Sequence, residues 1–460
     1  MTEFPVELVG DGLAVPCVDG TERPYVSLDS AASTAALPAV AQRVAEFLPW
    51  YSSVHRGAGY KSQLATAAYE EARAAALRFA GRSRRDDIAI FGRNATEAIN
   101  QLAYRLRLGP RDVVVTTVVE HHANLLPWAR TGASRRFVEC GTDGTFGIDD
   151  VIAALDGGPR PALLAITAAA NVTGWLPDID AIVASAHDRD IRVAVDAAQL
   201  AAHGPMPVEA DFIAWSGHKM YAPFGAGVLV GPHDAFVDGE PFLVGGGAVD
   251  LVDLDEVIWT DPPEREEAGS PNVVGAVALG AAIVELETLG WGAIQTHERE
   301  LADTLRRGLA AIAGVRLLGP SLDLPTLAVA AFTVAGVDHA LVAARLSAEF
   351  AIGVRHGCFC AHPYLIRLLG LSDDEVHRYR RDVLAGDRRS IPGAVRASAG
   401  ISATLAEVDR LCKAVAVIAD GSPPPVEYHQ DSTTGDWWPE GQSAPWSSPG
   451  RDLGASCARG

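Results

Sequence analysis

The stretch Ser216-Gly217-His218-Lys219-Met220-Tyr221 decides both the predicted fold and the predicted chemistry. The apolar run Phe212–Trp215 before it is typical of a buried strand, and the glycines around Lys219 indicate a loop at the end of that strand. A lysine there can reach a ligand at the C-terminal edge of a parallel sheet. Desolvation at such a place favours the neutral amine, which attacks an aldehyde. The alternative is a surface loop lysine, and the neighbouring segments decide between the two.

Composition narrows the class of protein. The net charge is −20, from 38 Lys and Arg against 58 Asp and Glu, so we expect no nucleic acid and no anionic membrane as partner. Residues Met1–Gly10 lack a basic, apolar signal pattern, and the apolar run Val273–Val284 is too short to span a membrane. The six cysteines are scattered and do not form a disulfide framework. These features predict a cytoplasmic protein.

Short apolar runs alternate with helical patterns between residues 84 and 231, which predicts a mainly parallel sheet covered on both faces. The predicted helices include Thr96–Leu106, with Asn94 as N-cap, and Asp178–Asp188. The predicted strands are Ile88–Phe91, Val113–Thr117, Leu163–Thr167, Arg192–Asp196, Phe212–Ser216 and Val228–Gly231.

The pattern changes near Gly290 to longer amphipathic helices, Ala293–Gly314 and His339–Phe350. We therefore predict a large domain over 28–290 and a smaller α+β domain over 291–420, with the N-terminal segment 1–27 packing against the smaller one. The tail 421–460 is rich in Pro, Ser, Gly and Asp and is predicted to be irregular. Its tryptophans, Trp437, Trp438 and Trp446, are candidates to dock it on the body.

Polar residues at other strand ends fit pyridoxal 5′-phosphate (PLP) beside Lys219. Asp196 ends a strand, where its carboxylate can pair with a pyridinium nitrogen, although an isolated Asp there also fits a helix N-cap. Gln199 lies one turn further on and can bond the ring hydroxyl. An imidazole from His121 or His122 can stack on the ring, although adjacent histidines are also ordinary in polar loops.

The phosphate needs N–H groups and hydroxyls at a helix N-terminus. Asn94-Ala95-Thr96, which opens a helix after a strand, supplies them, and Ser216 and His218 add side-chain donors from the lysine loop.

The ordered set of segments resembles the class V aminotransferase family, in its cysteine desulfurase and selenocysteine lyase branch. The resemblance implies PLP fold type I, an α/β fold with a mainly parallel seven-stranded sheet in the large domain and a smaller α+β domain. The matching segments are colinear over about Leu28 to Cys412: Leu28-Asp29-Ser30-Ala31-Ala32-Ser33, Val54-His55-Arg56-Gly57, Thr96-Glu97-Ala98-Ile99-Asn100, Glu120-His121-His122-Ala123-Asn124, Asn171-Val172-Thr173-Gly174, Asp196-Ala197-Ala198-Gln199, Ser216-Gly217-His218-Lys219-Met220-Tyr221, Glu267-Ala268-Gly269-Ser270-Pro271-Asn272 and Val395-Arg396-Ala397-Ser398.

The resemblance implies a role for each matching residue. Lys219 is the Schiff-base lysine, and His121, Asp196 and Gln199 contact the ring; the residues implied to hold the phosphate are Ala95, Thr96, Ser216 and His218. The residues implied to bind the substrate are Asn171, Arg396, Arg355 and His55. Ser270 is implied to reach the phosphate of a neighbouring subunit, which implies a homodimer with shared active sites. Asn94-Ala95 replaces the family's usual Gly-Thr, so one phosphate hydroxyl is missing.

The segment Arg355-His356-Gly357-Cys358-Phe359-Cys360-Ala361-His362-Pro363 indicates the type of reaction. By resemblance, Cys360 is the nucleophile that accepts sulfur, and Cys358 stands where the family usually has histidine. The Gly-Cys-Phe-Cys run also resembles the desulfurase domain of molybdenum cofactor sulfurases. Positive charge from Arg355, His356 or His362 can lower the pKa of a thiol here.

Two alternatives concern these cysteines. Both are also ordinary as small buried strand residues. The alternation of His356, Cys358, Cys360 and His362 also suggests zinc. However, residues i and i+2 of a strand lie about 6.6 Å apart, whereas ligand atoms around zinc lie roughly 3.8 Å apart. A straight strand therefore cannot supply all four ligands.

Residues 361 to 395 form an insert of 35 residues before Arg396, longer than is usual in the resembling branch. Ser372–Leu384 within it is predicted to be a charged helix, placed to reshape access or to dock a sulfur acceptor. The expected function is desulfuration of cysteine, selenocysteine or a related thio compound to alanine, with a persulfide on Cys360. The alternatives are a class V lyase, epimerase or aminotransferase without a cysteine nucleophile, and a catalytically silent PLP-binding or scaffold dimer.

Overall fold

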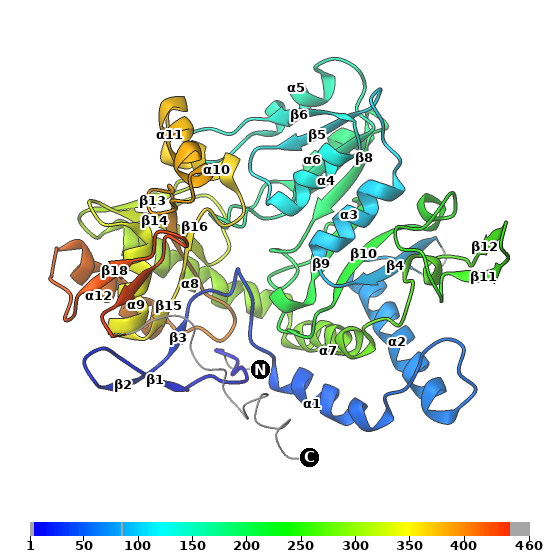
Figure 1. Cartoon of the computed structure of the whole chain (residues 1–460), viewed down its shortest axis with the longest axis horizontal. Helices are drawn as coiled ribbons and strands as arrows, with labels where there is room; N and C mark the ends of the chain where they lie inside the picture. The colour runs from blue at the N-terminus through cyan, green and yellow to red at the C-terminus, as the bar shows by residue number, and fades with distance from the viewer. Residues whose placement is uncertain (1–3, 84–85, 442–460) are drawn as a thin grey trace.

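A seven-stranded sheet forms the centre of the larger part of the chain in the computed structural model, which describes residues 4–83 and 86–441 (Figure 1). The strand order is β4-β10-β9-β8-β7-β5-β6, and only β10 runs antiparallel to its neighbours. This confirms the predicted mainly parallel sheet. The strands are β4 (Asp87–Gly92), β5 (Val113–Thr117), β6 (Ser134–Val138), β7 (Leu163–Thr167), β8 (Arg192–Asp196), β9 (Phe212–Ser216) and β10 (Gly227–Pro232).

Helices cover both faces of this sheet. The consecutive residues Leu163 and Leu164 of β7 fall in two different apolar clusters, because successive side chains of a strand point to opposite faces. Helix α3 (Ala95–Arg105) packs on one face, and α6 (Ile179–His187) and α7 (Val273–Leu289) pack on the other. The remaining elements of this part are α1 (Pro38–Phe47), α2 (Tyr60–Phe79), α4 (Leu126–Arg130), α5 (Ile148–Asp156), β11 (Val249–Val252) and β12 (Val257–Trp259).

A four-stranded antiparallel sheet, in the order β13-β14-β17-β16, forms the second part of the chain. Its strands are β13 (Val315–Leu318), β14 (Val329–Val334), β16 (Arg355–Gly357) and β17 (Ala394–Ser398). The helices packed on it are α8 (Trp291–Ala310), α9 (His339–Phe350) and α12 (Leu405–Ala419). This α+β arrangement agrees with the predicted smaller domain.

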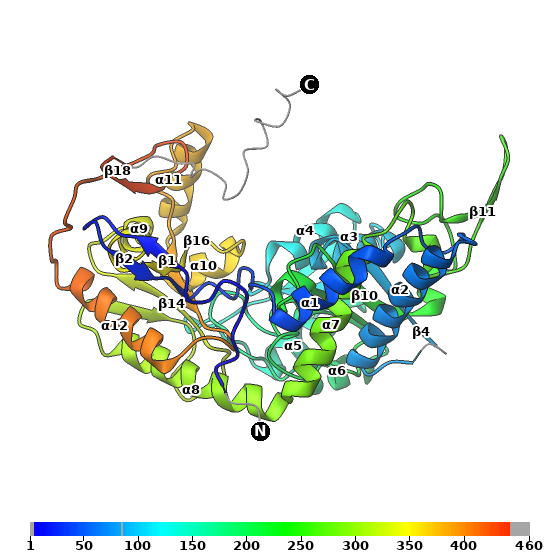
Figure 2. The ribbon, with the colours of Figure 1, turned by 90° about the horizontal axis from the view of Figure 1, so that it is seen from below.

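The N-terminal strands lie beside this second sheet although they are distant from it in sequence (Figure 2). β3 (Val26–Ser27) pairs in parallel with β15 (Ile352–Gly353), and the short pair β1 (Ala14–Pro16) and β2 (Glu22–Pro24) precedes it. The domain boundaries at residues 27, 290 and 420 stay predictions.

The tail corrects one expectation. Residues 421–441 are not irregular throughout, because β18 (Tyr428–Gln430) and β19 (Trp437–Pro439) form an antiparallel hairpin. Trp437 anchors it, since its Nε1 donates a hydrogen bond to Asp338 at the start of α9 over 3.1 Å. The composition of the tail did not indicate the hairpin, because the residues of its turn are mostly polar. Trp446 lies outside the described residues.

The insert contains two helices, α10 (His362–Leu369) and α11 (Asp373–Leu384), with Ser372 as the N-cap of the second. Within residues 4–83 and 86–441, no single helix has the length and apolar character to cross a membrane. Helices α7 and α8 reach that length and apolar character only when they are taken together, and the pair is bent by 83°.

Candidate functional site

A cavity of about 260 Å³ lies where the C-terminal ends of β7, β8 and β9 face the cysteine loop, residues 357–361. Each predicted site residue except His55 and Ser270 lines it. Those lining it are Lys219, Asp196, Gln199, His121, Ala95, Thr96, Ser216, His218, Asn171, Arg396, Arg355 and Cys360. The two sheets therefore bring together residues that lie 301 positions apart in sequence, from Ala95 to Arg396.

Lys219 ends a single 3₁₀ turn that follows β9 directly. Glycine at position 217 lets this turn pack closely, because a Cβ there would lie 3.0 Å from the carbonyl oxygen of Ala226. Burial lowers the pKa of the Lys219 amine to about 8, against the opposing effect of the Asp196 carboxylate, which raises it. Lys219 is thus a much better nucleophile near neutral pH than an ordinary lysine.

Asp196 ends β8 and His121 follows β5, and both line the same cavity. The Asp196 side chain is buried, and Oδ1 accepts a hydrogen bond from the amide of Ala198 at 3.0 Å. Burial raises the pKa of this carboxyl group, which has no ion pair among the described residues. In His121, Nδ1 accepts from the amide of Ala123, and burial lowers the pKa to about 4. The neutral ring therefore carries its proton on Nε2.

The N-terminus of α3 forms the polar end of the cavity. Asn94 caps it as predicted, its Oδ1 accepting from the amide of Glu97, while Ser216 Oγ accepts from the amide of Ala95 at 2.8 Å. Strand β10 approaches this terminus so closely that a Cβ on Gly227 would lie 2.3 Å from the Asn94 Cα. A helix N-terminus with hydroxyls from Thr96 and Ser216 is suited to an anion.

Arg396 and Asn171 form the opposite wall. Arg396 is 3 % exposed, its Nη1 donates to the carbonyl of Asn171 at 2.8 Å, and its buried Nε has no hydrogen-bond partner among the described residues. Asp29 lies between Arg396 and Arg355, at 3.3 and 2.9 Å from their Nη2 atoms. Burial lowers the pKa of Arg396 to about 10, although Asp29 opposes this effect. Asp29 lies within one of the segments that match the family, but the resemblance implied no role for it.

The cysteine loop is a tight turn, in which the amide of Ala361 donates to the carbonyl of Cys358 at 3.0 Å. Phe359 and Cys360 both have φ of 54°, in the left-handed region. The amide of His122 donates to the carbonyl of Cys360 at 2.7 Å, which ties the loop to the segment that carries His121. Cys360 is exposed towards solvent and Cys358 is half-buried.

The structure does not support two expectations about this loop: positive charge from its histidines and a zinc site. Burial lowers the pKa of both His356 and His362, so neither imidazole supplies positive charge to the Cys360 thiol at neutral pH. The set of His356, Cys358, Cys360 and His362 does not gather into a group of metal-ligand atoms within the described ranges.

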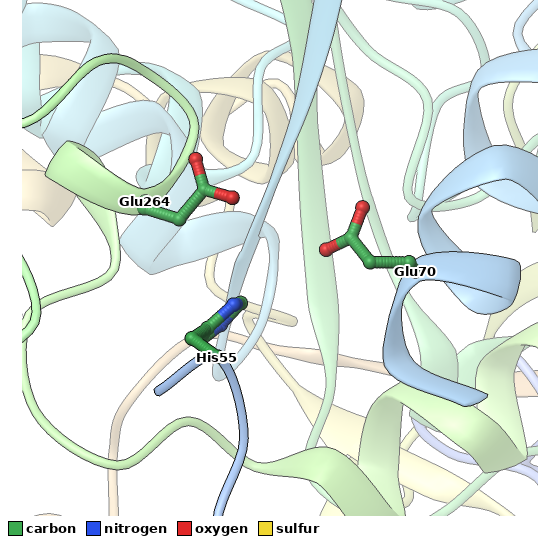
Figure 3. Close-up of side chains that lie close together, drawn as sticks. All are labelled: His55, Glu70 and Glu264. Carbon is green, nitrogen blue, oxygen red and sulfur yellow. The ribbon is translucent and has the colours of Figure 1, made fainter. Parts of the chain in front are cut away.

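His55 and Ser270 are not brought to this cavity, and both are exposed in a separate hollow of about 640 Å³. His55 also points towards Glu70 and Glu264, with candidate ligand atoms within 4.8 Å of one another (Figure 3). Glu70 lies 3.1 Å from the Arg73 guanidinium.

The residues of the first cavity fit PLP. Among residues 4–83 and 86–441, the buried Asp196 carboxylate forms no ion pair, and Lys219 is the cation whose charge acts on it. A protonated ring nitrogen would supply a direct counter-charge. The N-terminus of α3 suits the phosphate, and Lys219 lines the same cavity. The unpaired Nε of Arg396 suits a substrate carboxylate.

Known proteins resemble this chain in sequence and in fold. The family described as Aminotransferase class-V matches residues 26–411. A cysteine desulfurase of Klebsiella pneumoniae is 35% identical over 420 residues, covering 89% of this chain and 97% of the relative. A probable cysteine desulfurase of Mycobacterium leprae is 38% identical over 357 residues, or 75% of this chain, and the match spans 57% of the relative's length.

Solved structures agree with these matches. A cysteine desulfurase of Thermococcus onnurineus superposes with a TM-score of 0.76 at 32% identity, covering 86% of this chain and 95% of that one. The cysteine desulfurase CsdA of Escherichia coli superposes with a TM-score of 0.72 at 32% identity, covering 85% of this chain and 94% of that one. The chain therefore belongs to the class V aminotransferase family. Its resemblance to the cysteine desulfurase branch, and with it PLP fold type I, is confirmed.

Proposed function

We propose that this chain is a PLP-dependent cysteine desulfurase that removes sulfur from L-cysteine, or from a related thio or seleno amino acid, and leaves alanine. One observation carries the proposal: the Cys360 thiol shares one cavity with the Lys219 amine and the Arg396 guanidinium. A nucleophile that takes sulfur, an amine that attacks an aldehyde and a cation that holds a carboxylate are the groups that this reaction needs.

The cofactor-binding roles follow from where the side chains lie. Lys219 would attach PLP, Asp196 would pair with the ring nitrogen, and the neutral His121 would contact the ring. Gln199 would serve the ring hydroxyl, and its Nε2 also donates to the carbonyl of Ala31 at 2.8 Å. The residues that would hold the phosphate at the N-terminus of α3 are Ala95, Thr96, Ser216 and His218. When bound, PLP supplies an electron sink for the substrate Cα.

The chain's own residues then act in sequence. Arg396 and Asn171 hold the substrate carboxylate, which places the substrate sulfur towards the cysteine loop. Lys219 accepts the Cα proton and later returns a proton to carbon. The Cys360 thiolate attacks the substrate sulfur: the sulfur–carbon bond breaks, its electron pair stays with carbon, and a sulfur–sulfur bond forms on Cys360.

We further propose a homodimer in which Ser270 and His55 complete the site of the neighbouring subunit. The support is their exposure in a hollow that Lys219 does not line. A mixture of Lys219→Ala and Ser270→Asp chains tests this arrangement. Mixed dimers would contain one intact site, so desulfuration must exceed that of either variant alone. A mixture no more active than its components contradicts shared sites. The cytoplasmic location stays a prediction.

Two measurements test the proposed activity. The wild type should show a visible absorbance that borohydride bleaches and that Lys219→Ala lacks; without it in the wild type, the enzyme is not PLP-dependent. Cys360→Ser should stop the release of alanine and sulfide from cysteine with a reductant present, whereas Cys358→Ser should retain most of it. If Cys360→Ser works at the wild-type rate, the enzyme is a class V lyase, epimerase or aminotransferase that needs no cysteine.

A further inference from the structure

A second cavity, of about 610 Å³, lies on the other side of the cysteine loop and is called here the acceptor cavity. Its walls come from β16 and the cysteine loop, the first turn of α9, helix α11 with the residues after it, and the turn of the β18–β19 hairpin. Cys360 and Phe359 line both cavities, whereas Cys358 lines only this one. The cysteine loop is thus the wall between them.

The elements that close the acceptor cavity come from the insert and from the tail. Helix α11 belongs to the insert, and the hairpin lies beyond residues 26–411 that match the family. Arg388 joins the two, because its Nη1 donates to the carbonyl of Thr433 at 2.9 Å and its amide to that of Ser432 at 2.9 Å. A volume of about 610 Å³ falls within the range of roughly 300–1,000 Å³ for small-molecule sites.

The charge of this cavity is positive. Of its arginines, Arg355 is paired with Asp29 and Arg389 with Asp387, while Arg380 and Arg388 have no ion pair among the described residues. The carboxylate that lines the cavity in the described chain, Asp338, already accepts bonds from Trp437 and from two amides of α9. Apolar side chains complete the lining: Phe359, Val383, Leu384 and Ile391.

We propose that the acceptor cavity binds a small anionic thiol that takes the sulfur from Cys360, with Arg380 and Arg388 holding its anionic group. This inference rests on the proposed function. The acceptor thiolate attacks the outer sulfur of the Cys360 persulfide and forms a new sulfur–sulfur bond. The bond to the Cys360 Sγ breaks, and Cys360 leaves as thiolate. The outer sulfur moves at its own oxidation level, so the transfer needs no oxidant or reductant.

The test measures discharge of a persulfide that was labelled with [³⁵S]cysteine and freed of excess substrate. Mercaptosuccinate serves as the anionic thiol and 2-mercaptoethanol as the neutral one. For each enzyme, the rate constant with mercaptosuccinate is divided by the rate constant with 2-mercaptoethanol. Comparing this ratio between enzymes cancels the intrinsic reactivities of the two thiols. Arg380→Gln should lower this ratio about tenfold, since a charge-assisted contact is lost. Arg381→Gln, the same change at the next residue of α11, which does not line the cavity, should leave it unchanged.

A ratio that is equal in all three enzymes overturns the proposal, as does discharge by protein thiols alone. Binding of mercaptosuccinate to Cys360→Ser, which cannot take up sulfur, is measured by calorimetry in parallel. It should be weakened about tenfold by adding Arg380→Gln. If no label reaches Cys360, the proposed function and the acceptor role both fail, and the calorimetry still reports on the anion site. If label is taken up and mercaptosuccinate does not bind, only the present inference fails.

Discussion

The lowered pKa of Lys219 predicts how fast this chain reacts with an aldehyde at different pH values. Only the neutral amine attacks, and burial lowers the pKa of Lys219 from 10.5 to about 8. A decrease of about 2.5 units raises the neutral fraction near pH 7 about 300-fold, from roughly 0.03 % to roughly 10 %. The rate for the cofactor-free protein should therefore rise with pH through an apparent pKa near 8 and level off above pH 9.

Pyridoxal is the suitable probe, because it lacks the phosphate whose negative charge would itself raise the pKa of Lys219. Imine formation is followed by absorbance and fixed with borohydride, and the modified residue is located by peptide mapping. The background is small because the chain has only two other lysines, Lys61 and Lys413. Lys219→Ala measures that background directly.

Asp196→Asn provides a second check on the cause of the shift. The Asp196 carboxylate raises the pKa of Lys219, so its removal should move the apparent pKa below that of the wild type. An apparent pKa above 10 in the wild type, or a rate that is flat between pH 7 and pH 9, would refute the claim that burial activates Lys219. An upward shift in Asp196→Asn would refute the assigned electrostatics.

Three further predictions concern other residues of the chain. Glu267→Gln should lower the free energy of unfolding by about 3–5 kcal/mol, because the buried Arg73 guanidinium, 2.8 Å from the carboxylate, loses its buried counter-charge and keeps only the more exposed Glu70; urea unfolding against Glu264→Gln checks this. Arg396→Lys should raise KM for cysteine about tenfold with a smaller change in kcat, since lysine cannot form the two-pronged contact; equal losses in both would contradict it. Gly227→Ala should weaken PLP binding, measured by equilibrium dialysis, because its Cβ would meet the backbone of the α3 N-terminus at 2.3 Å; unchanged affinity would show that the helix can move.

The sequence predicted the central strands well and the edge strand poorly, for a physical reason. β5, β7 and β9 are buried along their whole length, so each appears as a short apolar run whose ends match the prediction. β6 lies at the edge of the sheet and buries only Val138, so its residues give no such run. The hairpin of the tail was missed because its pairing depends on contacts with α9 and Arg388 that no local pattern records.

The residues of the candidate site likewise fall into those that the sequence predicted and those that it did not. Asp196, Ser216 and Lys219 were predictable because parallel strands deliver their C-terminal residues to one edge of the sheet. Asp29 was not, since its importance comes from lying between two arginines more than 300 residues away. The acceptor cavity was not predictable either, because it exists only where the insert and the hairpin meet the cysteine loop.

The cysteine loop shows why its local sequence could not predict its geometry. An alternation such as His356, Cys358, Cys360 is typical of an extended strand, yet Phe359 and Cys360 both adopt positive φ. Such a conformation costs about 1–2 kcal/mol for each residue other than glycine. Hydrogen bonds from distant segments offset this cost: Asn171 Nδ2 donates to the carbonyl of Phe359 at 2.7 Å, and the His122 amide to that of Cys360 at 2.7 Å. Asn171 lines the first cavity and His122 directly follows His121, which also lines it, so the fold of the large sheet sets the position from which Cys360 meets both cavities.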